Sequence, residues 1–143
     1  MAQINKSALV PFSAEQMYQL VDDVPAYQEF LPWCGGSQEE SREDGVVVAS
    51  ITIAKGSINK TFTTKNTSSD IQRIHMELVE GPFKELVGYW DFKELKENAC
   101  RVTLNLDYEF SNRLLSMAIG PIFNQIANTM VDSFVQRAKP VYG

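Results

Sequence analysis

The chain has 143 residues, a net charge of −5 and 44% hydrophobic residues. This length fits one domain with a real core, and the hydrophobic content excludes intrinsic disorder. No apolar run approaches the roughly 20 residues of a membrane-spanning helix, and the N-terminus lacks the features of a signal or transit peptide. We therefore expect one cytoplasmic domain over residues 1–143. The negative charge disfavours DNA as a partner.

The first third of the chain predicts a strand and two short helices. Ile4–Val10 is predicted to be the first strand, and Ser13 with Gln16 forms a capping-box pattern that starts a helix near Ala14. Pro25 suits the first turn of a second short helix, Pro25–Phe30. A turn at Gly35-Gly36-Ser37 is expected to follow.

The middle of the chain predicts strands joined by short turns. The clearest is Val102–Phe110, in which apolar and polar residues alternate strictly. Such alternation indicates an antiparallel sheet with one face in water. Similar inward faces are predicted for three further strands: Val47, Ala49, Ile51 and Ile53; Ile74, Met76 and Leu78; and Leu86, Gly88, Trp90 and Phe92.

Asn112–Ala138 predicts a long closing helix with a wide apolar stripe. Pro121 lies inside this pattern and predicts a kink or a short break, because proline removes one backbone donor. The order of elements is strand, two short helices, about six strands and one long helix. It predicts an α+β domain in which a curved antiparallel sheet of about seven strands wraps around the C-terminal helix.

Few residues of this chain are suited to catalysis or metal binding. His75 is the only histidine, and its position between Ile74 and Met76 places it on the solvent face. Cys34 and Cys100 are far apart and are expected to be reduced thiols. No nucleotide-binding glycine motif is present, and the inward strand positions are almost entirely apolar. We expect no enzyme activity, no cofactor and no metal.

The charge is unevenly distributed along the chain. Gly45–Ser69 contains Lys55, Lys60 and Lys65 but no acid, so this stretch carries +3 and the remainder carries −8. The lysines can protect a sheet edge from aggregation. Alternatively, they can form a basic surface for RNA or for anionic lipid heads.

Aromatic residues gather in a short stretch that is difficult to bury. Phe30, Leu31, Pro32 and Trp33 follow one another in a loop-like region. Core packing explains each of them singly, but such a run also often borders a ligand entrance or meets a partner or a membrane. A curved sheet closed by one helix tends to leave a cavity, and an apolar cavity suits a lipid-like molecule.

Two segments of the sequence carry a family resemblance. Asp23–Cys34 reads DVPAYQEFLPWC, and Gly81–Leu86 reads GPFKEL, with Trp90 and Phe92 following. Both segments resemble the family of coenzyme Q-binding proteins and bacterial ribosome-association toxins, in the START-like, polyketide cyclase-like superfamily. Further similarity is found at Phe62-Thr63-Thr64 and at Asp107–Phe110.

The resemblance implies a helix-grip fold and two alternative functions. The first is binding of ubiquinone or a related polyprenyl lipid in a tunnel between the sheet and the C-terminal helix, as a lipid chaperone for respiration. The second is association with the large ribosomal subunit, which blocks subunit joining. Transient contact with a membrane surface would fit the first.

The candidate ligand-binding residues come from the apolar faces and the aromatic clusters. We predict the tunnel entrance between Leu114–Ile119 and Phe30–Trp33. Lys55, Lys60 and Lys65 are the candidates for contact with RNA or an anionic surface. The predicted tunnel residues are Phe30, Leu31, Trp33, Phe62, Leu78, Phe83, Leu86, Trp90, Tyr108, Phe110, Phe123, Ile126, Ala127 and Met130.

Overall fold

Seven antiparallel strands form one sheet in the computed structural model, which describes residues 2–70 and 72–143. Across the sheet the strand order is β1-β7-β6-β5-β4-β3-β2. The strands are β1 (Ala2–Val10), β2 (Cys34–Glu43), β3 (Val46–Lys55), β4 (Ile58–Ser69), β5 (Arg73–Glu80), β6 (Phe83–Lys96) and β7 (Ala99–Phe110). The helices are α1 (Ala14–Asp22), the 3-10 turn η1 (Val24–Ala26), α2 (Tyr27–Phe30) and α3 (Arg113–Tyr142).

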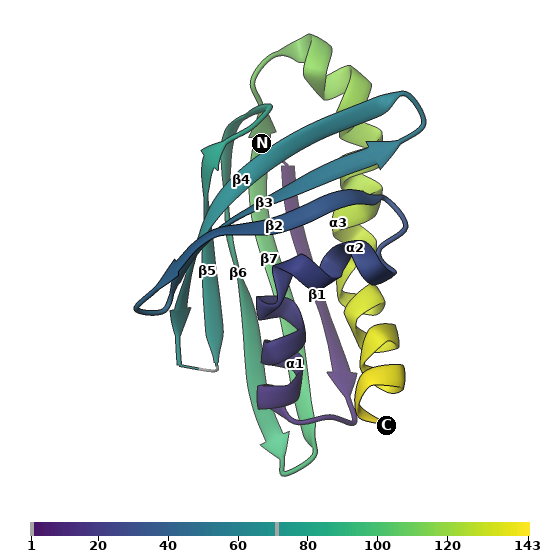
Figure 1. Ribbon diagram of the computed structural model, residues 1–143. Coiled ribbons are helices and arrows are strands. Elements are labelled where there is room, and N and C mark those ends of the chain that lie inside the picture. Colours follow the sequence, from purple (N-terminus) through teal and green to yellow (C-terminus); the bar gives the residue numbers. More distant parts are fainter. Residues whose placement is uncertain (1, 71) are drawn as a thin grey trace.

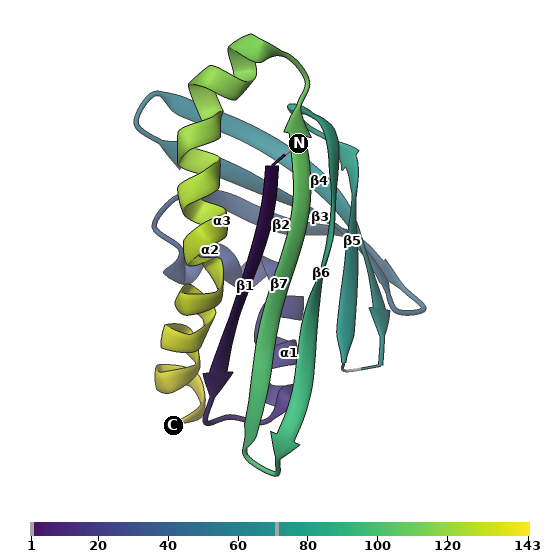
Figure 2. The same cartoon turned by 180° about the vertical axis from the view of Figure 1, so that it is seen from behind.

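The sheet curves so strongly that its two halves run in different directions. Figure 1 shows β2, β3 and β4 crossing the direction of β6 and β7, with α3 running along the hollow side. Figure 2 shows from behind how α3 passes beside the edge strand β1. Bulges bend strands, and register shifts occur in β2, between Thr63 and Thr64, and in β6. The predicted α+β helix-grip class is therefore confirmed.

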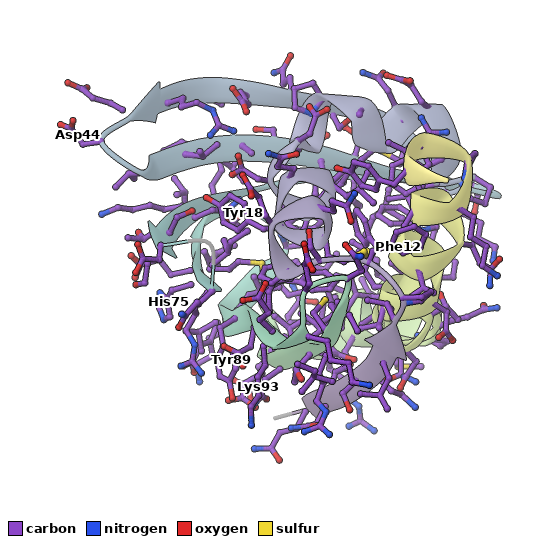
Figure 3. The ribbon with its side chains drawn as sticks, turned by 90° about the horizontal axis from the view of Figure 1, so that it is seen from below. Phe12, Tyr18, Asp44, His75, Tyr89 and Lys93 are labelled. Carbon is purple, nitrogen blue, oxygen red and sulfur yellow. The ribbon has the colours of Figure 1, made fainter. Side chains whose placement is uncertain are left out.

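The predicted alternation of β7 is present over its whole length. Every second residue from Cys100 to Phe110 is buried, and the residues between them are partly or fully exposed. The concave face thus provides most of the core, while the convex face meets water. His75 lies on the convex side as predicted, and Figure 3 shows it far from α3.

The start of α1 also follows the sequence prediction. The Ser13 hydroxyl accepts a hydrogen bond from the Gln16 amide at 3.1 Å, and the Gln16 side chain accepts one from the Ser13 amide at 2.9 Å. The predicted turn at Gly35-Gly36-Ser37 is wrong, because these residues belong to β2. A Cβ on Gly35 would lie 2.6 Å from the Cβ of Ala54, so glycine here permits close pairing with β3.

The long helix α3 continues through both of its prolines. Asn112 caps it by accepting a hydrogen bond from the Leu115 amide at 2.9 Å, and the helix has 30 residues. The predicted break at Pro121 is absent, whereas the alternative prediction, a kink, agrees with Figures 1 and 2, in which the first turns of α3 lean over the end of the sheet. Ile119 and Phe123 are both buried, and their packing holds the helix on either side of the proline. No helix within the described ranges is long and apolar enough to cross a membrane.

Candidate functional site

A cavity of about 80 Å³ lies between the concave face of the sheet and α3. Helix α3 contributes Phe123, Ile126, Ala127 and Met130 to its wall, and η1 and α2 contribute Val24 and Tyr27. Strand residues form the rest. The wall is almost entirely apolar, as expected for a site that binds by the hydrophobic effect.

Eight of the predicted tunnel residues line this cavity. They come from both the sheet and the helix, so the structure brings together segments that are distant in the sequence. These eight are Trp33, Phe62, Leu86, Trp90, Phe123, Ile126, Ala127 and Met130.

Three other predicted residues form an aromatic cluster with two members of the cavity wall. The ring of Phe83 stacks on Phe110 with centroids 4.9 Å apart, and it meets Phe123 at 5.0 Å. Tyr108 also contacts Phe123, at 4.7 Å. Phe62 meets the rings of Phe83 and Phe123. Phe83, Tyr108 and Phe110 are thus packed behind the cavity wall, not on its surface.

The remaining predicted residues, Phe30, Leu31 and Leu78, do not line the cavity. Leu31 is only 2% exposed and belongs to the core. The Phe30 ring packs on Phe134 at 5.4 Å, and the Arg137 guanidinium lies 4.9 Å from its centroid. Leu78 is partly buried on β5.

The predicted entrance between Leu114–Ile119 and Phe30–Trp33 is wrong. Phe30 contacts Phe134, which lies about four helical turns beyond Ile119 along α3. Trp33 is only 9% exposed and lines the cavity with Phe123 to Met130 of α3, so it belongs to the interior and not to an entrance. The apolar run was difficult to place from sequence, because only the tertiary fold shows which part of the helix covers it.

Sequence reasoning missed two polar residues of the cavity wall, Thr64 and Asn66. The Thr64 hydroxyl donates a hydrogen bond to the Asn66 side-chain oxygen at 2.9 Å. Both follow Phe62 at intervals of two along β4, and this spacing was the available signal. The other wall residues that were not named as candidates are Val24, Tyr27, Ile51, Ile53, Met76, Leu104 and Leu106.

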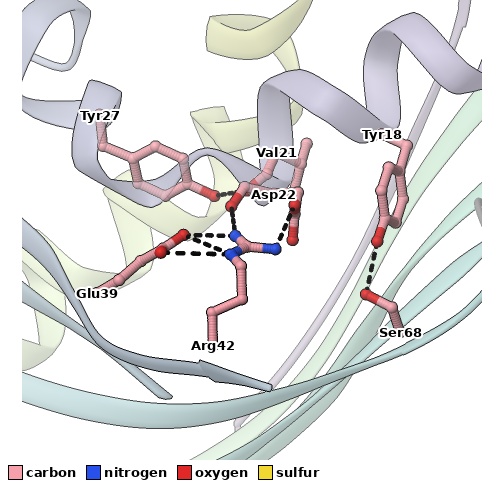
Figure 4. A network of polar contacts seen from close by, with 7 residues as sticks. All are labelled: Tyr18, Val21, Asp22, Tyr27, Glu39, Arg42 and Ser68. Carbon is pink, nitrogen blue, oxygen red and sulfur yellow. Dashed lines mark hydrogen bonds and ion pairs between the residues drawn. The ribbon is translucent and has the colours of Figure 1, made fainter. Parts of the chain in front are cut away.

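Polar contacts tie the short helices over one side of the site (Figure 4). Arg42 on β2 binds the Asp22 carboxylate at the end of α1 at 3.0 Å, and it also pairs with Glu39. The Tyr18 hydroxyl donates to the Ser68 hydroxyl at 2.7 Å. The Tyr27 hydroxyl donates to the Val21 carbonyl, and burial raises the pKa of Tyr27. These contacts hold α1 and α2 against the sheet.

Replacing Arg42 by glutamine should loosen α1 with little change in overall stability. The Arg42 side chain is 44% exposed, so losing its ion pairs should cost about 1 kcal/mol or less. Hydrogen exchange of the α1 amides should become faster, because local opening needs fewer contacts to break. Lys84→Gln is the control, since Lys84 is also exposed and its ion pair with Glu109 joins β6 to β7. Equal exchange in α1 for both variants would contradict this role.

The two thiols are poorly suited to nucleophilic chemistry. Both cysteines are free and buried. Burial raises the pKa of Cys100 to about 11 and also raises the pKa of Cys34. Since the thiolate is the reactive form, both groups are neutral at pH 7. Within the ranges that the structure describes, no three His, Cys, Asp or Glu side chains gather as metal ligands.

The three candidate lysines do not share one face. Lys60 stands opposite the buried Ile53 in the register, close to Lys55 at the end of the β3–β4 hairpin. Lys65 lies between Thr64 and Asn66, which face the cavity, so it points to the convex side, where it stands opposite Glu77. A basic surface can therefore include Lys55 and Lys60, but Lys65 belongs elsewhere.

Comparisons with known proteins agree with this fold. A family model described as polyketide cyclase / dehydrase and lipid transport matches residues 10–135. The ribosome association toxin RatA of Escherichia coli K12 is 49% identical over 142 residues, covering 99% of this chain and 90% of that protein. The protein of the same name from Vibrio cholerae is 50% identical over 143 residues, covering 100% and 99%.

A more distant relative is named after the ligand that it binds. The mitochondrial coenzyme Q-binding protein COQ10 homolog B of Xenopus laevis is 26% identical over 145 residues, covering 99% of this chain and 59% of that protein. These relatives are named as toxins or binding proteins, not as enzymes.

Solved structures share the fold at low sequence identity. A Thermus thermophilus protein has a TM-score of 0.84 at 16% identity, covering 99% of this chain and 100% of that one. An aromatase/cyclase from Streptomyces has a TM-score of 0.80 at 14% identity, covering 96% and 93%. The family model covers most of the chain, and this shows that the chain belongs to the polyketide cyclase / dehydrase and lipid transport family.

Proposed function

We propose that this protein binds an apolar, lipid-like molecule such as a polyprenyl quinone between the sheet and α3. One observation carries the proposal: the cavity wall is apolar and is shared by both layers of the fold. A ligand there would contact the sheet and the helix at once. The coenzyme Q-binding relative supports a quinone as the guest.

Binding in this proposal requires the cavity to widen. Its volume of about 80 Å³ is well below the roughly 300–1,000 Å³ of common ligand sites. Met130, a flexible and only partly buried side chain in the wall, is suited to make room. Helix α1 is a second element that can move, because the exposed ion pair between Arg42 and Asp22 that holds it costs little free energy to break.

The wall favours binding over catalysis. Its polar side chains are Thr64, Asn66 and the Tyr27 hydroxyl, which already donates to the Val21 carbonyl. General acid–base chemistry needs a group whose pKa lies near the working pH, and neither threonine nor asparagine supplies one. We therefore assign a carrier role to this chain, although some structural neighbours are aromatase/cyclases.

Organic extraction of natively purified protein, followed by mass spectrometry, tests the proposal. We expect a quinone or another neutral lipid to be retained. Short-chain ubiquinone added to the delipidated protein should quench the fluorescence of Trp33 and Trp90, which both line the cavity. If no lipid is retained and no saturable quenching is observed, the proposal is rejected.

A second candidate function is association with the large ribosomal subunit, in the cytoplasm. It is supported by full-length relatives that are 49% and 50% identical and are named ribosome association toxins. A ligand cavity and an outer surface can serve separate partners, so the two functions are compatible.

The double variant Lys55→Ala, Lys60→Ala should weaken ribosome association more strongly than Lys65→Ala. The first two lysines lie close together at one hairpin end, whereas Lys65 stands opposite Glu77 on the convex face. Each phosphate contact that is lost should lower the slope of log K against log salt by about 0.7 to 0.9. Co-sedimentation with purified 50S subunits at several salt concentrations measures this. Equal slopes for the wild type and the double variant would exclude the hairpin end as the contact.

A further inference from the structure

The cavity wall contains a pair of polar residues, Thr64 and Asn66, whose hydrogen-bonding groups are not all used among the residues that the structure describes. Asn66 stands in the register between two apolar neighbours, Val47 on β3 and Met76 on β5. Thr64 is similarly placed between Ala49 and Leu78. Two polar residues therefore interrupt an otherwise apolar wall at adjacent inward positions of one strand.

The hydrogen bond within this pair leaves a donor available. Thr64 donates to the side-chain oxygen of Asn66 at 2.9 Å, which directs the Asn66 amide nitrogen away from Thr64. A carboxamide nitrogen carries two N–H donors. No hydrogen bond from it is found among residues 2–70 and 72–143. The next inward position, Ser68, differs because its hydroxyl already accepts from Tyr18.

Asn66 is only partly buried, so its amide nitrogen remains accessible to a molecule that enters the cavity. Because the wall that the structure describes contains no lysine, arginine or histidine, a carboxylate or phosphate there would lack a counter-charge. A neutral acceptor avoids that cost. The chemistry of the site thus matches an oxygen of a quinone, a ketone or an ester.

We propose that the Asn66 amide donates a hydrogen bond to a carbonyl oxygen of the bound lipid, and that Thr64 orients the amide. This inference rests on the proposed function, and it narrows the ligand class to neutral lipids that carry a carbonyl group. Thr64 acts as a positioning residue, while Asn66 contacts the ligand.

Two probes of similar shape test the inference: decyl-benzoquinone, and decylbenzene, which lacks the carbonyl oxygens. Asn66→Leu should weaken binding of the quinone about tenfold and leave the affinity for decylbenzene within about twofold. Thr64→Val should weaken quinone binding by a smaller factor. Asn5→Leu is the control, because Asn5 is an exposed residue on β1.

An infrared readout on the wild-type protein keeps the test independent of how well the variants fold. The carbonyl stretch of bound decyl-benzoquinone should shift to lower frequency than in hexane, and Asn66→Leu should abolish the shift. Quinone binding without a shift, or with equal affinity in Asn66→Leu, overturns this inference alone. If neither probe binds the wild type, the proposed function is overturned as well.

Discussion

Replacing Gly88 by alanine should lower the free energy of unfolding by about 3 kcal/mol or more. A Cβ at this position would lie 2.1 Å from the carbonyl oxygen of Asn105 and 2.9 Å from the Cα of Leu106. Both are backbone atoms of β7, so relief requires separation of the paired strands β6 and β7. Urea denaturation monitored by tryptophan fluorescence measures the loss.

Gly36→Ala is the matched control for this prediction. Gly36 also lies in a strand, but a Cβ there meets only the Thr52 hydroxyl, at 3.8 Å. Its cost should remain within about 1 kcal/mol, which is the ordinary range for a substitution without a clash. Similar losses for Gly36→Ala and Gly88→Ala would show that the close approach of β6 and β7 is not the cause.

The same glycine lies beside the cavity. In β6 it stands between Leu86 and Trp90, and its cross-strand neighbours are Met76 and Leu106. All four of these residues line the cavity. The close approach of β6 and β7 at Gly88 therefore affects the position of this part of the wall.

Replacing Ala127 by leucine should reduce affinity for a quinone probe by at least about tenfold while the protein still folds. Ala127 is 3% exposed and lines the cavity from the helix side. The added carbons of leucine would therefore fill part of the space in which we propose that the ligand binds. Titration with decyl-benzoquinone measures the affinity, and thermal unfolding checks the fold.

Ala118→Leu is the control on the same helix. Ala118 is exposed in the first turns of α3, where the added carbons meet no wall residue. Its affinity for the probe should match the wild type. If Ala127→Leu binds as tightly as Ala118→Leu, the ligand occupies a different place from this cavity.

Local patterns were sufficient for most of the fold. The alternation in Val102–Phe110 predicted both the strand and its buried face, because side chains on a strand point to opposite faces in turn. The capping box at Ser13 predicted the start of α1, because its hydrogen bonds join residues only three apart. Six wall residues of the cavity could likewise be predicted from inward-facing positions on the strands and the helix, whereas Trp33 came from the aromatic run and Phe62 from the family resemblance.

The sequence by itself thus determined the order of elements, the apolar faces and the curved sheet around α3. Only the tertiary structure decided that Gly35 and Gly36 continue a strand, because that depends on how closely Ala54 approaches. Only the tertiary structure showed that the Arg137 guanidinium packs on the Phe30 ring and that Thr64 and Asn66 belong to the cavity wall. Periodicity reports which way a side chain faces along its own element. Contacts between distant elements depend on the curvature of the sheet and the path of α3, which no local pattern encodes.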